Sequence, residues 1–103
     1  MDKKTETGIK SLKISEDVIE AVIKNAVMSV DGVGGLFGKR PVVMDLTSEF
    51  PEVTVSVKLT YSCKAKNVCE NIQKKVRDDI LSMMGIAIGA VNVRVEGIAA
   101  YGA

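Results

Sequence analysis

Histidine and tryptophan are absent from this chain of 103 residues, and its only aromatic residues are two tyrosines and two phenylalanines. Histidine is the side chain that most often serves as a general base or as a metal ligand near neutral pH. Its absence argues against a catalytic triad, against the common zinc sites and against an activated thiol nucleophile. We predict a protein that has no enzymatic activity and binds neither a metal nor a cofactor.

Cysteine is also scarce, with Cys63 and Cys69 as the only two. Their spacing is neither that of a redox CxxC motif nor half of a usual zinc site. We expect two free thiols, because cytoplasmic compartments keep cysteines reduced. Asp78 and Asp79 are adjacent on an expected helix and would point roughly 100° apart, so a shared metal or proton is not expected.

Long hydrophobic runs and an excess of charge of one sign are missing as well. The longest apolar stretch, residues 83–91, is far shorter than the ~20 residues that a membrane-spanning helix requires. The polar residues 1–7 are not followed by the apolar segment of a secretory signal, so we predict a cytoplasmic location. Fourteen basic and thirteen acidic residues leave a net charge of +1, which gives no long-range attraction for nucleic acid or an anionic bilayer.

Alternating apolar and polar residues, in contrast, are plentiful. Residues 52–62 alternate over a long stretch and predict a central strand with one buried face, and residues 91–98 predict a second such strand. A shorter strand is predicted at 42–48, joined to the central strand as a hairpin. Residues 8–14 alternate loosely and predict a short edge strand.

Two segments carry apolar residues at helical spacing. The first helix is expected to follow Ser15 as its N-cap, and the second to follow Asn67 and to stop at Gly85. The predicted fold is α+β and two-layered, with two helices packed on one face of a three- to four-stranded mixed sheet in the order β(short)-α-β-β-α-β. Residues 1–7 are expected to be a disordered tail, and 8–103 a single domain.

A glycine-rich segment, residues 31–41, is predicted to be a loop after the first helix. Its candidates for partner binding are Leu36, Phe37, Lys39 and Arg40. The stretch from Gly32 to Gly35 has the GxxG spacing with which KH domains clamp a nucleic-acid strand. A KH clamp lies between two helices, whereas this loop is expected to lead into a strand. A loop that ends a helix, a partner-binding loop and a nucleic-acid clamp therefore all stay open.

The polar face of the central strand is a second candidate surface. Thr54 and Thr60 lie on this face together with Ser56 and Lys58. Helices on one side of a sheet leave the other side uncovered, and threonine-rich strands are suited to pairing through such a face or an edge. We therefore include Thr54 and Thr60 among the candidate partner-binding residues.

Several segments of the chain, taken in order and at these spacings, resemble one known family. They are Gly8-Ile9-Lys10-x-x-Lys13-Ile14-Ser15-x-Asp17-Val18-Ile19, Val30-Asp31-Gly32-Val33-x-Gly35-Leu36, Val53-x-Val55-x-Val57-x-Leu59, Val68-x-x-x-Ile72-Gln73-x-x-Val76 and Val91-Asn92-Val93-x-Val95-x-Gly97-Ile98. Together they resemble the alkaline shock protein family of small Gram-positive envelope-stress proteins. The chain departs from the family in having Met84-Gly85 where Thr-Gly is usual, and in lacking a long charged tail.

This resemblance implies a non-enzymatic, cytoplasmic protein that self-associates and is held near the membrane by a separate anchor protein. We therefore expect a homo-oligomer that acts as a cell-envelope stress response or scaffold protein and docks to a membrane-anchored partner. The alternative is a small nucleic-acid-binding module that uses Gly32 to Gly35 with Lys39 and Arg40.

Overall fold

The computed structural model describes residues 15–47, 49–60 and 64–98. Its elements are α1 (Glu16–Met28), β1 (Val33–Leu36), β2 (Val42–Asp45), β3 (Glu52–Leu59), α2 (Ala65–Met84) and β4 (Ala90–Ile98). The predicted α+β class and two helices are confirmed, and the sheet has four strands, but the order of the described elements is α-β-β-β-α-β and not β-α-β-β-α-β. The fourth strand is β1, which lies where a loop was predicted. The strand predicted at 8–14 lies outside the described residues.

Helix α1 begins where its capping signal predicts. The side chain of Ser15 accepts a hydrogen bond from the backbone N–H of Val18, and Glu16 and Asp17 occupy the first turn, where the helix dipole favours negative charge. The apolar stripe of the helix is buried against the sheet. Burial compensates for the many β-branched residues, which are weak helix formers.

Helix α2 begins at Ala65, two residues before the predicted N-cap at Asn67. Lys64 takes the cap position without a side-chain hydrogen bond, so packing rather than capping fixes the start of this helix. Its buried stripe is Val68, Ile72, Val76 and Ile80. The helix ends at Gly85, as predicted, in a left-handed conformation with φ of 70° that glycine adopts at low cost.

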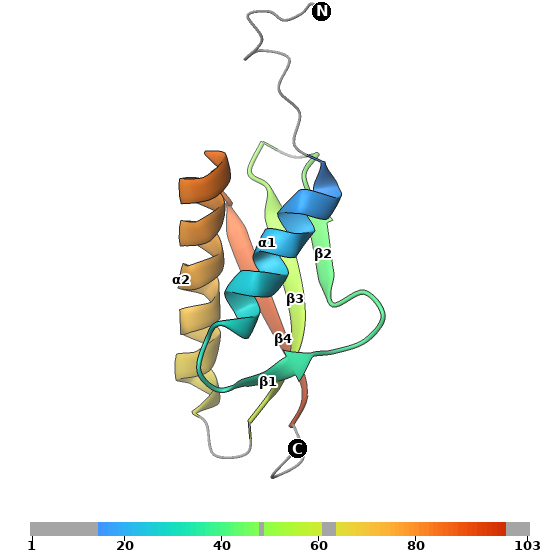
Figure 1. Cartoon of the computed structure of the whole chain (residues 1–103), viewed down its shortest axis with the longest axis vertical. Helices are drawn as coiled ribbons and strands as arrows, with labels where there is room; N and C mark the ends of the chain where they lie inside the picture. Colours follow the sequence, from blue (N-terminus) through green and yellow to red (C-terminus); the bar gives the residue numbers. More distant parts are fainter. Residues whose placement is uncertain (1–14, 48, 61–63, 99–103) are drawn as a thin grey trace, which may run out of the picture.

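Strand β3 is the central strand of the sheet, as predicted, and it uses both of its edges. β4 pairs with it in parallel along its whole length, from Glu52 opposite Ala90 to Leu59 opposite Ile98. β1 and β2 both pair with it antiparallel, β2 opposite 52–55 and β1 opposite 57–59. Because β4 occupies one edge throughout, β1 and β2 share the other edge end to end (Figure 1).

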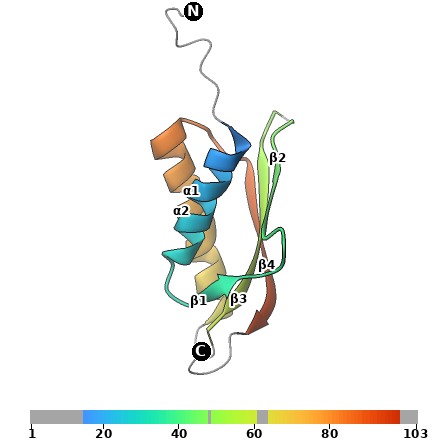
Figure 2. The ribbon, with the colours of Figure 1, turned by 45° about the vertical axis from the view of Figure 1, so that its right-hand side comes forward.

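The two short strands are separated by an excursion of the chain at residues 37–41. Within the ladder these residues stand opposite the single residue Ser56. The Phe37 N–H donates to the Ser56 carbonyl at 3.0 Å, and the Ser56 N–H donates to the Pro41 carbonyl at 2.8 Å. The segment therefore leaves the sheet and returns to it without breaking the pairing on either side, and it forms the loop that projects beside β2 in Figures 1 and 2.

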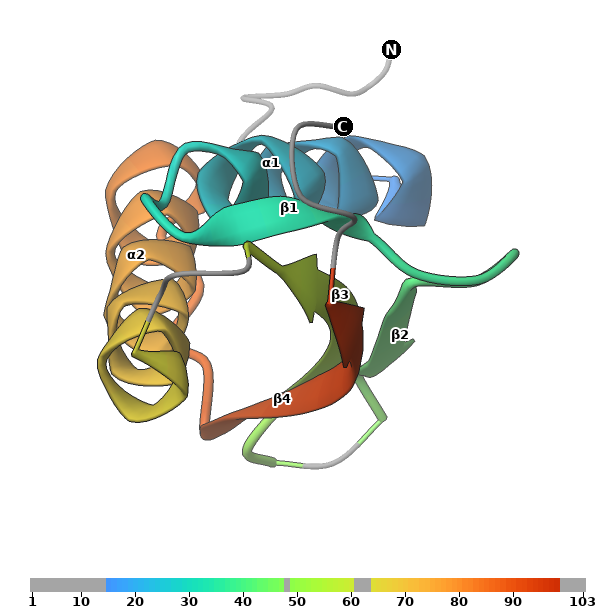
Figure 3. The same ribbon diagram turned by 90° about the horizontal axis from the view of Figure 1, so that it is seen from below.

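The core lies between β3 and the two helices. Val53, Val55, Val57 and Leu59 point toward the helices and are completely buried, whereas the residues between them are partly exposed. Both helices lie on this inner side of β3, and the same arrangement is seen from below in Figure 3. In the part of the chain that the structure describes, no helix lies on the opposite side of the sheet.

Candidate functional site

The helix-free side of the sheet, which we call the outer face, is formed by alternate residues of three strands. These residues are Val43 and Asp45 of β2, Glu52, Thr54, Ser56 and Lys58 of β3, and Asn92 and Arg94 of β4. Among the described residues, no element packs over this face (Figure 2). Apart from Val43 it is polar, which suits contact with water or with a polar partner surface.

Of the two predicted threonines, only Thr54 belongs to the outer face. Thr54 lies within β3, where its hydroxyl accepts a hydrogen bond from the Asn92 side chain at 3.5 Å. Thr60 follows the last residue of β3, and its backbone N–H donates to the Gly32 carbonyl at 2.8 Å. Thr54 is therefore a surface residue of the sheet, whereas Thr60 ties the end of β3 to the turn before β1.

Acidic and basic residues lie in different parts of the outer face. Asp45 and Glu52 stand directly opposite one another at the hairpin end, so two acidic side chains meet there. The hydroxyl and the backbone N–H of Thr47 both donate hydrogen bonds to the Asp45 carboxylate. These bonds, the one from the hydroxyl most of all, lower the pKa of the carboxyl below its ordinary value of 3.8. The basic residues Lys58 and Arg94 lie further along β3 and β4.

Lys58 is the half-buried basic residue of the outer face, and its neighbours across the sheet are glycines. Gly35 of β1 and Gly97 of β4 stand opposite it on either side. A Cβ added at Gly97 would lie 3.5 Å from Lys58 Cγ, and one added at Gly35 would lie 3.9 Å from Lys58 Cε. The methylene stem of Lys58 therefore lies in the space that these two glycines leave open.

The four residues predicted to form a partner-binding loop lie in different surroundings. Leu36 belongs to β1, opposite Val57, and packs half-buried against the core. Phe37 is 41% exposed, and Lys39 and Arg40 are exposed within the excursion at 37–41. The expectation that Leu36 lies outside the regular elements was therefore wrong, because pairing with β3 turns the glycine-rich segment into a strand.

The GxxG spacing lies in a turn and a strand. Gly32 precedes β1 with φ of 97°, Gly35 lies within it, and the segment runs antiparallel to β3. A KH clamp requires this spacing between two helices. The geometry therefore differs from that of a KH domain, as the sequence order indicated.

A surface that the sequence did not single out is the outer edge of β4. The side-chain amide of Gln73 in α2 donates to the Val91 carbonyl at 2.9 Å and covers the start of this edge. Beyond it no described element covers this edge, and Val95 is 42% exposed and Ile98 56% exposed. Alternation predicts the strand, but it does not reveal which strand stands at the edge of a sheet.

Arg94 and Glu96 carry the charge on this open part of β4. Their side chains form an ion pair with 2.9 Å between Arg94 Nε and Glu96 Oε2, although Arg94 remains 66% exposed. The pairing with β3 shifts by one residue here, so that Glu96 is the extra residue of a bulge between Val95 and Gly97. Both charges therefore lie on the same side of the strand within a slightly irregular edge.

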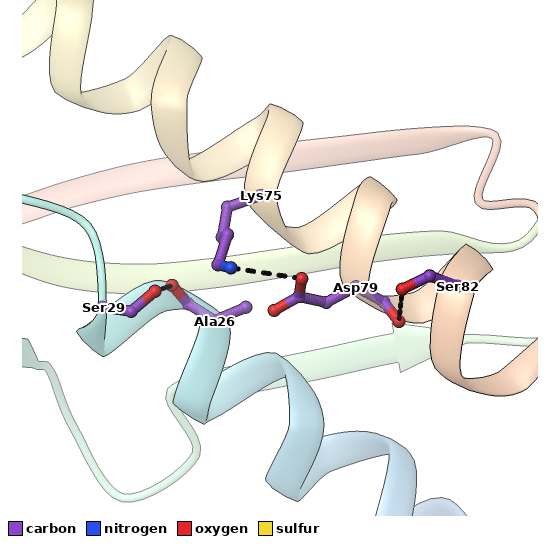
Figure 4. Close-up of polar contacts among 5 residues, drawn as sticks. All are labelled: Ala26, Ser29, Lys75, Asp79 and Ser82. Atoms are coloured by element: carbon purple, nitrogen blue, oxygen red, sulfur yellow. Dashed lines mark hydrogen bonds and ion pairs between the residues drawn. The ribbon is translucent and has the colours of Figure 1, made fainter.

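Several polar contacts of the helical layer are formed by exposed or partly buried side chains. Lys75 pairs with Asp79 at 3.3 Å on α2, the Ser82 hydroxyl donates to the Asp79 carbonyl, and the Ser29 hydroxyl donates to the Ala26 carbonyl (Figure 4). Within 15–47, 49–60 and 64–98, no polar side chain is buried and no group of three metal-ligating side chains is found.

A profile of the alkaline shock protein 23 family, which has a cell envelope-related function, matches residues 40–100. The uncharacterized protein Spy1535 of Streptococcus pyogenes serotype M6 is 34% identical, with 89% of this chain and 81% of that protein covered. The uncharacterized protein Spy1614 of the same serotype is 27% identical, with 99% of this chain and 98% of that protein covered.

Solved structures with the same fold include variants of MamM-CTD. A copper form superposes with a TM-score of 0.56 at 14% identity, over 81% of this chain and 98% of that one. A manganese form gives a TM-score of 0.56 at 13% identity, over 81% of this chain and 99% of that one. At this identity the likeness concerns the fold alone, and the metals belong to those proteins.

Proposed function

Because the chain belongs to the alkaline shock protein 23 family, we propose that it is a non-enzymatic scaffold of the cell-envelope stress response. It acts by associating with copies of itself and by docking to a membrane-anchored partner. The observation that carries the proposal is that helices cover one side of the sheet and no described element covers the other.

The side of the sheet that the helices cover forms the apolar core and stabilises the fold, but it contains few groups that could take part in a reaction. Every fully buried side chain in the described residues is apolar, so this part of the chain offers no buried acid, base or nucleophile. The other side presents the outer face, the outer edge of β4 and the exposed side chains of Phe37, Lys39 and Arg40. Surfaces of this kind support binding, which is the activity proposed.

Attachment to the envelope would come from the partner. Among the described residues no helix is long and apolar enough to cross a membrane. The net charge of +1 also gives bare anionic lipid little attraction for the chain. We propose a cytoplasmic location at the periphery of the membrane, with a protein anchor holding the chain there, as the family resemblance implies.

The test separates a protein anchor from direct lipid binding. A tagged chain is expressed in cells of the producing organism, and its membrane fraction is compared with the binding of the purified chain to protein-free vesicles containing anionic lipid. We expect the chain to sediment with cell membranes, to co-purify with one integral membrane protein after detergent extraction, and to ignore bare vesicles. Strong vesicle binding, or complete recovery away from membranes, would contradict the docking proposal.

A pair of charge variants refines this test. Lys39→Glu with Arg40→Glu removes the exposed basic residues of the excursion. Lys74→Glu with Arg77→Glu makes the same change of charge on the exposed side of α2 and serves as the control. If the anchor contacts the excursion, only the first pair reduces recovery of the anchor protein. Equal loss in both would indicate a general effect of charge.

A further inference from the structure

The outer edge of β4 offers hydrogen-bonding groups that the described part of the chain does not use. Alternate residues of a strand direct their backbone N–H and C=O groups to the same side. The Val91 carbonyl points to the outer edge, where it accepts a hydrogen bond from Gln73, so the backbone groups of Val93 and Val95 point to the outer edge as well. No further bond to this edge is found within 15–47, 49–60 and 64–98. An edge of this kind is a template for another strand.

The charges beside this edge are arranged symmetrically about one residue. Arg94 and Glu96 flank Val95, and their ion pair shows that the two side chains reach the same region. If a second copy of β4 ran antiparallel about a two-fold axis at Val95, Arg94 of each copy would stand opposite Glu96 of the other. Opposite charges across an antiparallel pair are favourable, and like charges are not.

Other registers lose this complementarity. An axis at Arg94 would place two arginines opposite each other, and an axis at Glu96 would do the same with two glutamates. An axis between two residues would place outward-facing side chains opposite inward-facing ones. Only the axis at Val95 pairs unlike charges twice, and it also brings together the two exposed Val95 side chains.

We infer that β4 is a homodimerisation edge, at which a second copy of this chain pairs antiparallel over Arg94 to Glu96 with the two-fold axis at Val95. The inference rests on the proposed self-association and names the surface that performs it. The pairing of the two β4 strands joins the sheets of the two copies into one continuous sheet. The two-fold symmetry limits the assembly to a dimer, because each copy contributes the same edge and no unpaired β4 edge remains.

The bulge at Glu96 keeps this pairing short. Bulges and charged side chains limit the length over which an edge can pair, and the Gln73 contact covers the edge before Val93. The paired segment is therefore about three residues in each copy, because the faces of the strand reverse after Glu96, and so short a segment favours a reversible dimer over an extended fibre. Exposed apolar side chains such as Phe50 and Met83 also lie at the opposite end of the molecule, but they are not flanked by a symmetrical pair of opposite charges.

Charge exchange tests the inference with the full chain. Arg94→Glu places two glutamates opposite each other at both positions, and Glu96→Arg does the same with arginines. We expect each single variant to raise the dimer Kd by roughly tenfold or more at low salt, measured by sedimentation equilibrium. The double variant Arg94→Glu, Glu96→Arg keeps the symmetry and should return the Kd to within about threefold of the wild-type value.

Mixing provides an independent check. Arg94→Glu and Glu96→Arg each repel themselves but complement one another, so an equimolar mixture should form heterodimers while each variant alone stays mostly monomeric. Arg77→Glu, which makes the same charge change on the exposed side of α2, should leave the Kd unchanged. Circular dichroism verifies that each variant is folded, and a single variant that fails to fold is replaced by Arg94→Gln or Glu96→Gln.

The outcomes separate the inference from the proposed function. A wild-type oligomer that persists with an unchanged Kd in both single variants and the mixture would overturn the β4 edge and leave self-association standing. In that case Thr54→Lys tests the outer face instead. A wild-type chain that is monomeric at all concentrations up to the millimolar range would overturn both the edge and the self-association.

Discussion

Val57 lies at the middle of the inner face of β3 and is completely buried between the sheet and the helices. Val57→Asp would place an unpaired carboxylate in this apolar layer, at a cost of several kcal/mol against a total stability of about 5–15 kcal/mol. We expect the variant to be largely unfolded at room temperature, as measured by circular dichroism. Ser56→Asp, on the outer face one position away, is the control. An unchanged thermal transition in Val57→Asp would contradict the burial of this face.

Leu36 and Phe37 are adjacent but have different surroundings. Leu36 packs against the core from β1, whereas Phe37 is 41% exposed at the start of the excursion. Leu36→Ala should lower the free energy of unfolding by about 2 kcal/mol, and Phe37→Ala should lower it by less than half as much. Urea denaturation of both variants measures the difference. Equal losses would mean that the two side chains are buried alike.

The hairpin of β2 and β3 carries a local electrostatic conflict. Asp45 and Glu52 are directly opposite each other at the end next to the connecting turn, and like charges in this position are unfavourable. Glu52→Lys would place opposite charges across the pair and should raise the midpoint of thermal denaturation. Thermal denaturation at low salt measures the gain. Glu70→Lys, on the exposed side of α2, is the control, and a gain of the same size there would assign the effect to net charge.

The pH dependence of this hairpin follows from Asp45. Its bonds from Thr47 lower the pKa of the carboxyl in the folded state from 3.8. A lowered folded pKa means that the contribution of Asp45 is present above pH 3.8 and is lost as the pH falls through the lower folded value. In Thr47→Ala the carboxyl should therefore titrate at higher pH, as measured by NMR of the Asp45 side chain. An unchanged titration would mean that Thr47 does not hold the carboxylate.

Elements whose signals are local could be predicted from the sequence. Ser15 and Gly85 bound their helices because a cap bond and a left-handed residue depend on a few adjacent positions. The alternation of β3 likewise requires only that one face be buried. β1 could not be predicted, because its glycines indicate a loop and its strand conformation depends on pairing with residues more than twenty positions away.

The candidate surfaces show the same division. The sequence indicates the polar outer face, since Thr54 alternates with buried valines. It does not indicate that β4 is an edge strand or that Leu36 is partly buried, because both depend on the order of strands in the sheet.

For the molecule as a whole, charge balance separates the proposed scaffold from a nucleic-acid-binding module. Binding through Lys39, Arg40 and the lysines of α2 would release counterions and weaken steeply with rising salt. With a net charge of +1 and no KH-like clamp, we expect no binding of single-stranded RNA or DNA at physiological salt. Fluorescence anisotropy over a range of salt concentrations measures it. A steep salt slope that flattens in Lys39→Glu, Arg40→Glu would favour the nucleic-acid reading.

The excursion at 37–41 has a practical consequence, because the strands on both of its sides are held in register by β3. Residues inserted at Gly38 would lengthen only a surface loop, and each doubling of loop length costs about 0.6 kcal/mol in closure entropy. The excursion also lies at the sheet edge opposite β4. An epitope or fluorescent label placed there would be carried by every copy without entering the core, and the position of the protein in living cells could be followed while its β4 edge stays available.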